Sequence, residues 1–581
     1  MVTIRRGYVL LTAALALQAS TWAVISLVRN LVAPLGGAPS PTMIAFQIAV
    51  TVVTLPIYAG HWLWAQRLAA SGPDERGAVL RRVYLYGTLA LLTGPLAANA
   101  HGLLTGLLRR AFGLPSAETV GAVEGGAVVD SLAHPVVAVL VLGLLLVYHR
   151  REVLADRAAV PEVGGGALMR RLYMLGYAAA GLGAMASGSV LLARRVLPDF
   201  MAVSTVTAPL DRVVVGSAAQ ALVGAGLWAA FWTWAQRLYR DGGDDERRSA
   251  VRKLLLYAVV AVGVLTVAAN AGGILAGSLR VALGLAPEGD IRDALAPMLV
   301  AAVAWGYHAR VLRDDAASAA DAPRQVSIRR LYRYLIAGIG GAATLIGAAG
   351  IVRALAIAAT SSAVVAAVKD QLATAAAAVV VGVPLWVLPW WRIQAVAVAG
   401  DPVAEDERQS TIRKLFLYLV LFVTGVTTIT SAVYLVYRLV SWMLGVVSPA
   451  PLSSDVAQAI GYIAIAATAW IYHLRVIRVD GDLQAHAASH RLAGRRVVLV
   501  DPGGDVTPVV DAVGRALGRD LPDLRVEVAR SAEDDAVRAA VASADAVVVP
   551  WDLARPETGP LPGAGAPPAA DLAAAVAASP A

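Results

Sequence analysis

One stretch of sequence recurs three times at a fixed internal spacing, and this repeat constrains the fold more than any other feature. In each copy an Asp-Glu-Arg triplet is followed by a basic pair that begins six residues after the Glu, by a Tyr five residues later, and then by a long apolar run. The copies are Asp74-Glu75-Arg76 with Arg81-Arg82 and Tyr86, Asp245-Glu246-Arg247 with Arg252-Lys253 and Tyr257, and Asp406-Glu407-Arg408 with Arg413-Lys414 and Tyr418. A spacing kept three times predicts three tandem structural units.

A second set of motifs recurs in phase with the first. Each copy opens on two arginines with a Tyr two positions on, and each has Tyr-His-x-Arg at the end of its last apolar run. The later motifs are Tyr148-His149-x-Arg151, Tyr307-His308-x-Arg310 and Tyr472-His473-x-Arg475, and the opening ones begin at Arg5, Arg170 and Arg329. These positions predict domains over residues 1–160, 161–320 and 321–478. Because the first opening motif matches two that lie deep inside the chain, the first apolar run is predicted to be a retained transmembrane helix and not a signal peptide.

Composition places these units in a membrane. Of 581 residues, 58% are hydrophobic and 15% are charged, which is too apolar for a soluble multidomain protein. The chain has no cysteine, which excludes disulfides, thiolate metal sites and cysteine nucleophiles. Its net charge of +8 comes from Lys and Arg at the ends of apolar runs, a pattern of membrane topology, so the expected partner is the lipid bilayer and no nucleic acid.

The apolar runs are predicted to be twelve transmembrane helices, four in each copy. A helix needs about 20 apolar residues to cross a bilayer. The predicted spans are 8–28, 44–66, 83–108, 132–149, 172–193, 213–236, 254–279, 293–309, 331–352, 371–391, 415–440 and 455–473. Lys and Arg are more numerous on the side that holds the N-terminus, and an even number of helices returns the chain to that side. We therefore predict an all-α polytopic protein of the cell inner membrane or plasma membrane, with both termini cytoplasmic.

After the third copy the composition changes. Residues 490–555 alternate short Val-rich runs with helical ones, which predicts a small cytoplasmic α/β domain with a parallel sheet. Asp501-Pro502-Gly503-Gly504 follows the first predicted strand, but it lacks both the dinucleotide GxGxxG pattern and the P-loop lysine. A regulatory module that docks a cytoplasmic protein partner is therefore favoured over nucleotide binding. Residues 556–581, rich in Pro, Gly and Ala, are predicted to be a disordered tail.

The aromatic and basic motifs allow two readings. Trp, Tyr and Arg gather where a helix leaves the bilayer, because their apolar parts stay in lipid while their polar ends reach water or headgroups. The first reading is anchoring of the helices. The second is a site for a lipid headgroup or another anionic ligand, formed where copies meet. The Asp-Glu-Arg triplets are read as salt-bridge networks in solvated loops.

The equivalent histidines also allow two readings. His149, His308 and His473 could bind zinc if the three copies surround an axis. Tyr-His-x-Arg is also typical of a helix end, where His and Arg lie near the negative end of the helix dipole. The second reading is preferred, and no metal, cofactor or catalytic residue is assigned.

Few polar residues fall inside the predicted spans. Asn99, Asn270 and Ser431 occupy equivalent positions, thirteen residues after the Tyr of the first motif, and His101 follows Asn99 in the first copy only. Such residues face another helix rather than lipid, so they line a pathway or bond across a helix pair. No Asp or Glu lies clearly in mid-span, which weakens the case for a proton- or sodium-coupled transporter.

The four-helix unit resembles an uncharacterised bacterial membrane family, the domain of unknown function 5671. The residues that carry the resemblance are Pro56 to Arg67 in the second helix, Arg81 to Tyr86 at the start of the third and Tyr148 to Arg151 at the end of the fourth, with their counterparts in the other copies. The resemblance covers about residues 5–478 as three copies and leaves the C-terminal segment outside. It implies compact four-span units and no activity.

These observations predict a non-enzymatic membrane scaffold or sensor whose cytoplasmic module reports to a partner. The repeated polar motifs lie at one end of the helices and not in mid-bilayer. The alternative is a transporter or channel for a small or lipid-like solute, with Asn99, His101, Asn270 and Ser431 near its path, although three copies are unusual for a carrier built from paired repeats. An enzyme would need convergent His, Asp or Glu residues, and the sequence offers no such set at meaningful spacing.

Overall fold

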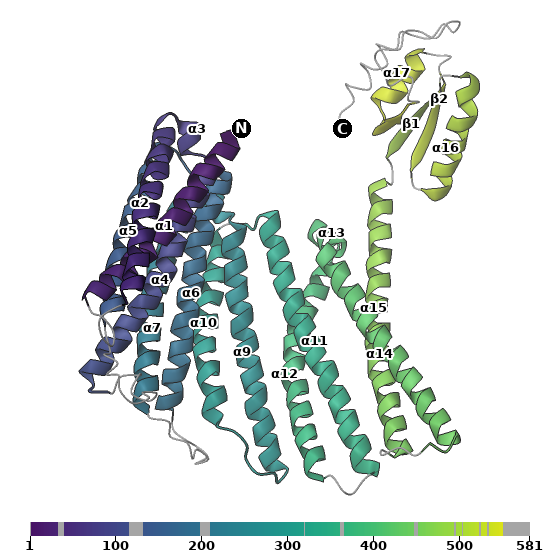
Figure 1. Ribbon diagram of the computed structural model, residues 1–581. Helices are drawn as coiled ribbons and strands as arrows, with labels where there is room; N and C mark the ends of the chain where they lie inside the picture. Colours follow the sequence, from purple (N-terminus) through teal and green to yellow (C-terminus); the bar gives the residue numbers. More distant parts are fainter. Residues whose placement is uncertain are drawn as a thin grey trace. The chain divides into compact units, whose positions relative to one another are not determined.

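The computed structural model describes residues 2–32, 40–114, 132–197, 210–318, 320–360, 365–446, 451–492, 495–501, 503–521, 524–530 and 534–549. The chain divides into two compact units, Met1–Trp390 with Ala432–Tyr462 and Trp391–Ser431 with Ile463–Ala581. Long helices make up most of the described chain (Figure 1). The predicted tail, 556–581, lies outside the described residues.

Each sequence copy contributes four long helices, with a short helix before the third. Copy 1, residues 1–160, holds α1 (Val2–Val32), α2 (Pro41–Ala70), α3 (Pro73–Arg76), α4 (Val79–Ala111) and α5 (Ala133–Ala159). Copy 2, residues 161–320, holds α6 (Gly164–Val196), α7 (Leu210–Asp241), α8 (Asp244–Arg247), α9 (Ala250–Ala282) and α10 (Ile291–Ser318). Copy 3, residues 321–478 with an extension, holds α11 (Pro323–Thr360), α12 (Val365–Ala397), α13 (Pro402–Gln409), α14 (Thr411–Met443) and α15 (Leu452–Leu492).

Eleven helices in the described part of the chain are long and apolar enough to cross a membrane, so the chain is a largely helical, multi-pass membrane protein. The long helix that falls short is α4. Pro95, Asn99 and His101 interrupt its apolar middle, and arginine pairs stand near both of its ends. Length and composition thus support eleven of the twelve predicted spans.

The fourth helix of each copy extends further than its apolar run. The sequence predicts that these helices end at Tyr-His-x-Arg, yet α5 continues to Ala159, α10 to Ser318 and α15 to Leu492. The residues beyond the motif include Arg, Ala and Leu, which are good helix formers, so the backbone stays helical after the apolar run stops. The reading of these motifs as helix ends is therefore wrong, and each His lies well before the last turn of its helix.

Helices pack in pairs within a copy and make further contacts across copy boundaries. The pairs are α1 with α2, α4 with α5, α6 with α7, and α9 with α10. Across boundaries, α4 contacts α6 and α7, and α9 contacts α11. The α6–α7 contact requires glycine, because a Cβ at Gly181 would lie 2.4 Å from the backbone nitrogen of Trp228, and one at Gly224 would lie 2.3 Å from that of Met185. The contacts of α4 with α6 and of α9 with α11 show that the third long helix of one copy packs against the first helix of the next.

The C-terminal segment forms a small α/β unit. Its elements are β1 (Arg496–Asp501), the 3-10 turn η2 (Gly504–Val506), α16 (Thr507–Asp520), β2 (Arg525–Arg530), α17 (Asp534–Ala542) and β3 (Ala546–Val548). The three strands are parallel in the order β2-β1-β3, with Val498 opposite Glu527 on one side and Val547 on the other. Val498 and Val500 of β1 pack with Ala540 and Val541 of α17. The central strand is the most buried of the three.

Candidate functional site

In every copy a buried Arg at the start of the third helix bridges the second and fourth helices. In copy 1 the Arg81 guanidinium donates to Asp156 (Nε to Oδ2, 2.7 Å) and to Gln66 (Nη2 to Oε1, 2.7 Å). The equivalents are Arg252 with Asp315 at 3.0 Å and Gln236 at 2.8 Å, and Arg413 with Asp480 at 2.6 Å and Gln394 at 2.8 Å. Each set is named here an Arg–Asp–Gln triad. It lies at the motif end of its copy, meaning the helix ends that carry the repeated charged motifs.

Burial makes the triads important for stability. The side chains of Arg81 and Asp156 are each 4% exposed, and that of Arg413 is 1% exposed. A charge so far from water is tolerated only when it is paired and hydrogen-bonded. Aromatic rings add to the pairing, because Arg81 lies 5.5 Å from the ring centroid of Trp62, and its equivalent in copy 2 makes the same contact. The triads therefore fix the second, third and fourth helices against one another.

The predicted Tyr-His-x-Arg residues separate into three environments. The tyrosines of copies 1 and 2 accept a hydrogen bond from the aromatic cluster of the second helix, with Trp62 Nε1 donating to Tyr148 at 2.6 Å and Trp232 Nε1 to Tyr307 at 2.7 Å. All three tyrosines, Tyr148, Tyr307 and Tyr472, are similarly exposed, at 38%, 41% and 41%. The arginines are exposed, and they are Arg151, Arg310 and Arg475. The Tyr and Arg of each motif are thus exposed, whereas the His between them is buried.

The three histidines are buried and bonded locally. Each ring Nδ1 lies 2.7–2.9 Å from the carbonyl oxygen four residues earlier in its own helix. The residues are His149, His308 and His473. Among the described residues no group of three or more His, Asp or Glu side chains is placed to hold a metal ion. These histidines pack as interior side chains with a backbone partner.

The Glu of each of the first two Asp-Glu-Arg triplets binds the opening arginines of its own copy. Glu75 pairs with Arg5 at 2.9 Å and with Arg6 at 2.7 Å, and Arg6 holds the pKa of this carboxyl below its usual range. Glu246 pairs with Arg170 at 2.5 Å and Arg171 at 2.8 Å. Their side chains are 17% and 9% exposed, so these groups are partly buried ties between helices rather than solvated loop residues.

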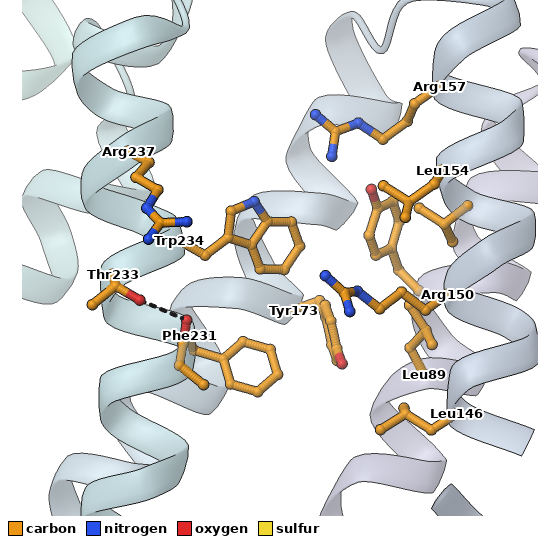
Figure 2. A pocket seen from close by; sticks show the side chains of 13 residues that line it. Leu89, Leu146, Arg150, Leu154, Arg157, Tyr173, Phe231, Thr233, Trp234 and Arg237 are labelled. Atoms are coloured by element: carbon orange, nitrogen blue, oxygen red, sulfur yellow. Dashed lines mark hydrogen bonds between the residues drawn. The ribbon is translucent and has the colours of Figure 1, made fainter. Parts of the chain in front are cut away.

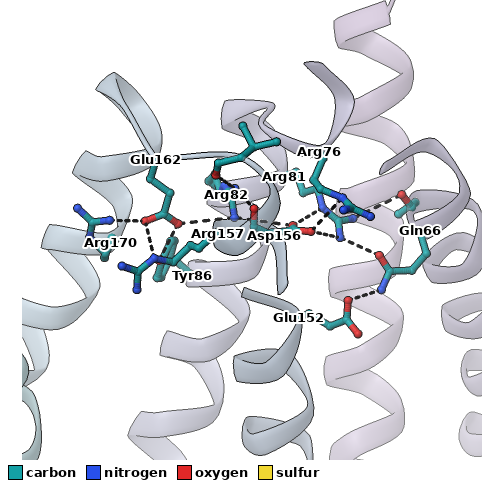
Figure 3. Close-up of polar contacts among 12 residues, drawn as sticks. Gln66, Arg76, Arg81, Arg82, Tyr86, Glu152, Asp156, Arg157, Glu162 and Arg170 are labelled. Carbon is teal, nitrogen blue, oxygen red and sulfur yellow. Dashed lines mark hydrogen bonds and ion pairs between the residues drawn. The ribbon is translucent and has the colours of Figure 1, made fainter. Parts of the chain in front are cut away.

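Between copies, one acidic residue binds basic residues from both sides. The Glu162 side chain is 0% exposed, and it accepts from Arg170 of copy 2 at 2.6 Å and from the Tyr86 hydroxyl of copy 1 at 2.8 Å, with Arg82 and Arg157 each 3.6 Å away (Figure 3). At the next boundary Asp321 contacts Lys253 at 3.1 Å and Arg329 at 2.7 Å. Each acid stands eight residues before the opening Arg of the next copy. These two residues are named here the linker carboxylates.

The four polar residues predicted inside the membrane do not form one group. Asn99 donates to the carbonyl oxygen of Pro95 at 2.9 Å, and Asn270 donates to that of Thr266 at 2.7 Å, so both amides bond within their own helix. His101 Nε2 lies 3.3 Å from the carbonyl oxygen of Gly216 in copy 2. Ser431 is buried. One contact across helices and two local bonds do not outline a pathway.

A cavity of about 460 Å³ lies at the motif end between copies 1 and 2. Arg150 and Arg157 of α5 border it on one side, and Trp234 and Arg237 of α7 border it on the other, with Tyr173 of α6 between them (Figure 2). Leucines from copy 1 complete the wall, and they are Leu89, Leu146 and Leu154. The cavity is therefore lined by three arginines together with aromatic and aliphatic side chains.

In the α/β unit the loop after β1 is closed by its own carboxylate. Asp501 is 1% exposed, and its Oδ1 accepts from the Gly503 amide at 2.9 Å and from the Thr507 hydroxyl at 2.9 Å. Gly503 and Gly504 both have positive φ, which suits glycine. Asp501 thus ties the end of β1 to the loop and to the first residue of α16.

Comparison with known protein families identifies the family of the helical region. The family described as Domain of unknown function (DUF5671) matches residues 6–144, 171–307 and 330–468. The chain belongs to this family. The three matches confirm the predicted DUF5671 resemblance and the three tandem copies. No curated protein and no solved structure matches the DUF5671 chain.

Sequence reasoning on this DUF5671 protein found one member of each triad and missed two. The missed acids, Asp156, Asp315 and Asp480, each follow the His of Tyr-His-x-Arg by seven residues. The missed amides, Gln66, Gln236 and Gln394, each follow a Trp of the second helix by four. Both spacings are kept three times, so the signal was available. The acids also lie beyond the end of each DUF5671 match, so only comparison among the copies reveals them.

Proposed function

We propose that this DUF5671 protein is a non-enzymatic membrane scaffold or sensor of twelve transmembrane helices in three four-helix repeats, with both termini and the α/β unit in the cytoplasm. The observation that carries the proposal is the set of buried ionic ties at the motif ends. Triads hold helices together within each copy, and linker carboxylates join copy 1 to copy 2 through Tyr86 and copy 2 to copy 3 through Lys253.

These ties favour a rigid array over a moving carrier. Alternating access requires one repeat to rock against another. Moving copy 1 against copy 2 would separate the buried Glu162 from Tyr86 and Arg82 of copy 1, and breaking a buried pair costs about 3–5 kcal/mol. Asp321 and its partners oppose the same movement at the next boundary. A scaffold needs this rigidity, whereas a carrier would have to overcome it in every cycle.

We further propose that the α/β unit is the surface that reports to a cytoplasmic protein partner. The segment lacks the dinucleotide GxGxxG pattern and the P-loop lysine, and Asp501 bonds the loop that leads to α16, which favours protein docking through residues 490–555 over nucleotide binding. Because Asp480 belongs to a triad, a truncation that tests this role must end after Leu492 rather than at the end of copy 3. The truncated protein is expected to keep its thermal stability in detergent and to lose its in-cell cross-links to partners. An unchanged cross-linking pattern would contradict the docking role.

A flux measurement separates the scaffold from the transporter. The full chain is reconstituted in liposomes, and movement of potassium, phosphate and a water-soluble dye is compared with that in empty liposomes. A scaffold gives no excess movement in the wild type or in an Asn99→Ala/His101→Ala variant. Solute movement in the wild type that falls in this variant would overturn the scaffold and support a path near these two residues.

A further inference from the structure

The cavity between copies 1 and 2 holds arginines that the ionic ties do not use. Arg150 and Arg237 border the cavity; both are exposed, and neither has a carboxylate or hydrogen-bond partner among the described residues. Arg157 also borders the cavity, and its ion pair with Glu162, the one that it makes among the described residues, is 3.6 Å long. The triad arginines at the same end of the helices, by contrast, are each paired with an Asp. Two unpaired guanidinium groups beside a third therefore form a concentrated positive site.

This positive site breaks the repeat. The residues at the equivalent places one copy later are Ala309 for Arg150, Ala316 for Arg157 and Ala395 for Arg237. The structural residues around them are kept, because Tyr86 is matched by Tyr257 and Tyr173 by Tyr332. All three cations are thus present at the boundary between copies 1 and 2. At the boundary between copies 2 and 3, alanine occupies each equivalent position. A packing role would have been repeated with the fold, whereas a ligand role needs only one boundary.

The lining matches an amphiphile rather than a soluble anion. Arg150 and Arg157 are seven residues apart on α5, two helical turns, so they share a face of that helix. Trp234 and Tyr173 lie among the cations, as aromatic residues do at headgroup depth. Leu89 and Leu146 extend the wall along the apolar parts of α4 and α5. A phosphate bound by the arginines would therefore continue into a surface suited to an acyl chain.

We infer that this cavity binds the headgroup of an anionic phospholipid. Arg binds phosphate oxygens through two parallel N–H donors, which makes it the preferred residue for such a group. Basic pockets between transmembrane helices bind anionic lipid headgroups in the same way. The cavity, about 460 Å³, is of the size that ligand pockets commonly have. The site goes beyond the scaffold role and does not depend on it, because a transporter could hold the same lipid.

The bound headgroup would also reach the boundary between copies. Arg157 and Tyr86 line the cavity, and both contact the linker carboxylate Glu162. A phosphate in the cavity competes with Glu162 for Arg157, since both are anions within reach of one guanidinium. The occupant is thereby coupled to the tie between copies 1 and 2.

The test is native mass spectrometry of the full chain after incubation with equal amounts of phosphatidylglycerol and phosphatidylcholine. Wild-type protein is expected to retain phosphatidylglycerol preferentially. Arg150→Ala/Arg237→Ala, which copies the residues of the next boundary, is expected to lower its retention at least about tenfold, because two charge-assisted hydrogen-bonding groups are lost. The matched control is Arg151→Ala/Arg240→Ala, which removes the same charge from the same two helices at exposed positions outside the cavity lining.

Four outcomes would overturn the assignment. One is an absence of lipid preference in the wild type, and another is an equal loss in the cavity variant and the control variant, which would indicate nonspecific surface charge. Competition by soluble glycerol 3-phosphate as effective as that by phosphatidylglycerol would indicate a site for soluble phosphates. If the alanine variant does not fold, Arg150→Lys/Arg237→Lys replaces it, because lysine keeps the charge but not the paired donors. This variant is expected to lower retention of phosphatidylglycerol, by less than about tenfold. Unchanged retention of phosphatidylglycerol in it would also refute the arginine contacts.

Discussion

The triad of copy 2 gives a quantitative test of the buried ties. Asp315 receives two hydrogen bonds from Arg252, at 3.0 and 3.1 Å, and both side chains are 5% exposed. Asp315→Asn removes the countercharge and leaves Arg252 with neutral acceptors, Gln236 and the introduced amide. Breaking a buried pair from one side costs about 3–5 kcal/mol. Since the Asn oxygen still accepts one bond, a loss of about 3 kcal/mol is expected, which is roughly a 100-fold change in the unfolding equilibrium.

The assay is unfolding of the purified protein in mixed dodecyl maltoside and dodecyl sulfate micelles, followed by tryptophan fluorescence. Asp293→Asn is the matched control on the same helix, because its pair with Arg194 has side chains 51% and 45% exposed and should be worth less than about 1 kcal/mol. Replacing both partners, as Arg252→Met/Asp315→Leu, should recover most of the loss, because apolar residues leave no buried charge.

Two results would refute this reasoning. A loss within about 0.5 kcal/mol for Asp315→Asn, the size of an ordinary surface substitution, would show that the pair is solvated in the membrane environment. A double variant that is less stable than the single one would show that the ion pair itself, and not the cost of an unpaired Arg, sets the stability.

Two further predictions address helix packing and pH. Gly224→Ala should destabilise the protein by about 1–3 kcal/mol in the same assay, because its Cβ would lie 2.3 Å from the Met185 nitrogen, whereas Gly226→Ala meets nothing within 4 Å and should change stability by less than about 1 kcal/mol. Equal effects would refute the close α6–α7 contact. Because Arg6 depresses the folded pKa of Glu75, this group stabilises the fold above its unfolded pKa, and that contribution is lost as pH falls through the folded pKa. The melting temperature of the wild type should therefore exceed that of Glu75→Gln at pH 7, with a gap that closes toward pH 3; a gap independent of pH would contradict the ion pair.

The sequence predicted what the copies share and overlooked what sets one copy apart. The charged motifs, the long helices and the α/β segment follow from spacing and periodicity that recur. Asp156 was missed because it follows the apolar run, in a stretch where the helix was expected to have ended. Arg150 was missed for the opposite reason, since a search for equivalent positions discards a residue whose counterpart in the next copy is Ala309. Asn99 was chosen for its predicted depth, but a single sequence does not show that an amide bonds its own helix.

The position of the linker carboxylates suggests how a chain of this kind could gain or lose repeat units by duplication or deletion. Glu162 and Asp321 each stand eight residues before the next opening Arg, so a new unit needs only one acid at that position to engage its neighbour. In copy 3 the counterpart of Arg82 and Lys253 is Lys414. Lys414 is exposed and has no acidic partner among the described residues. Each unit thus carries a donor for a successor whether or not one exists. Whole units could be gained or lost in evolution without redesign of their interiors.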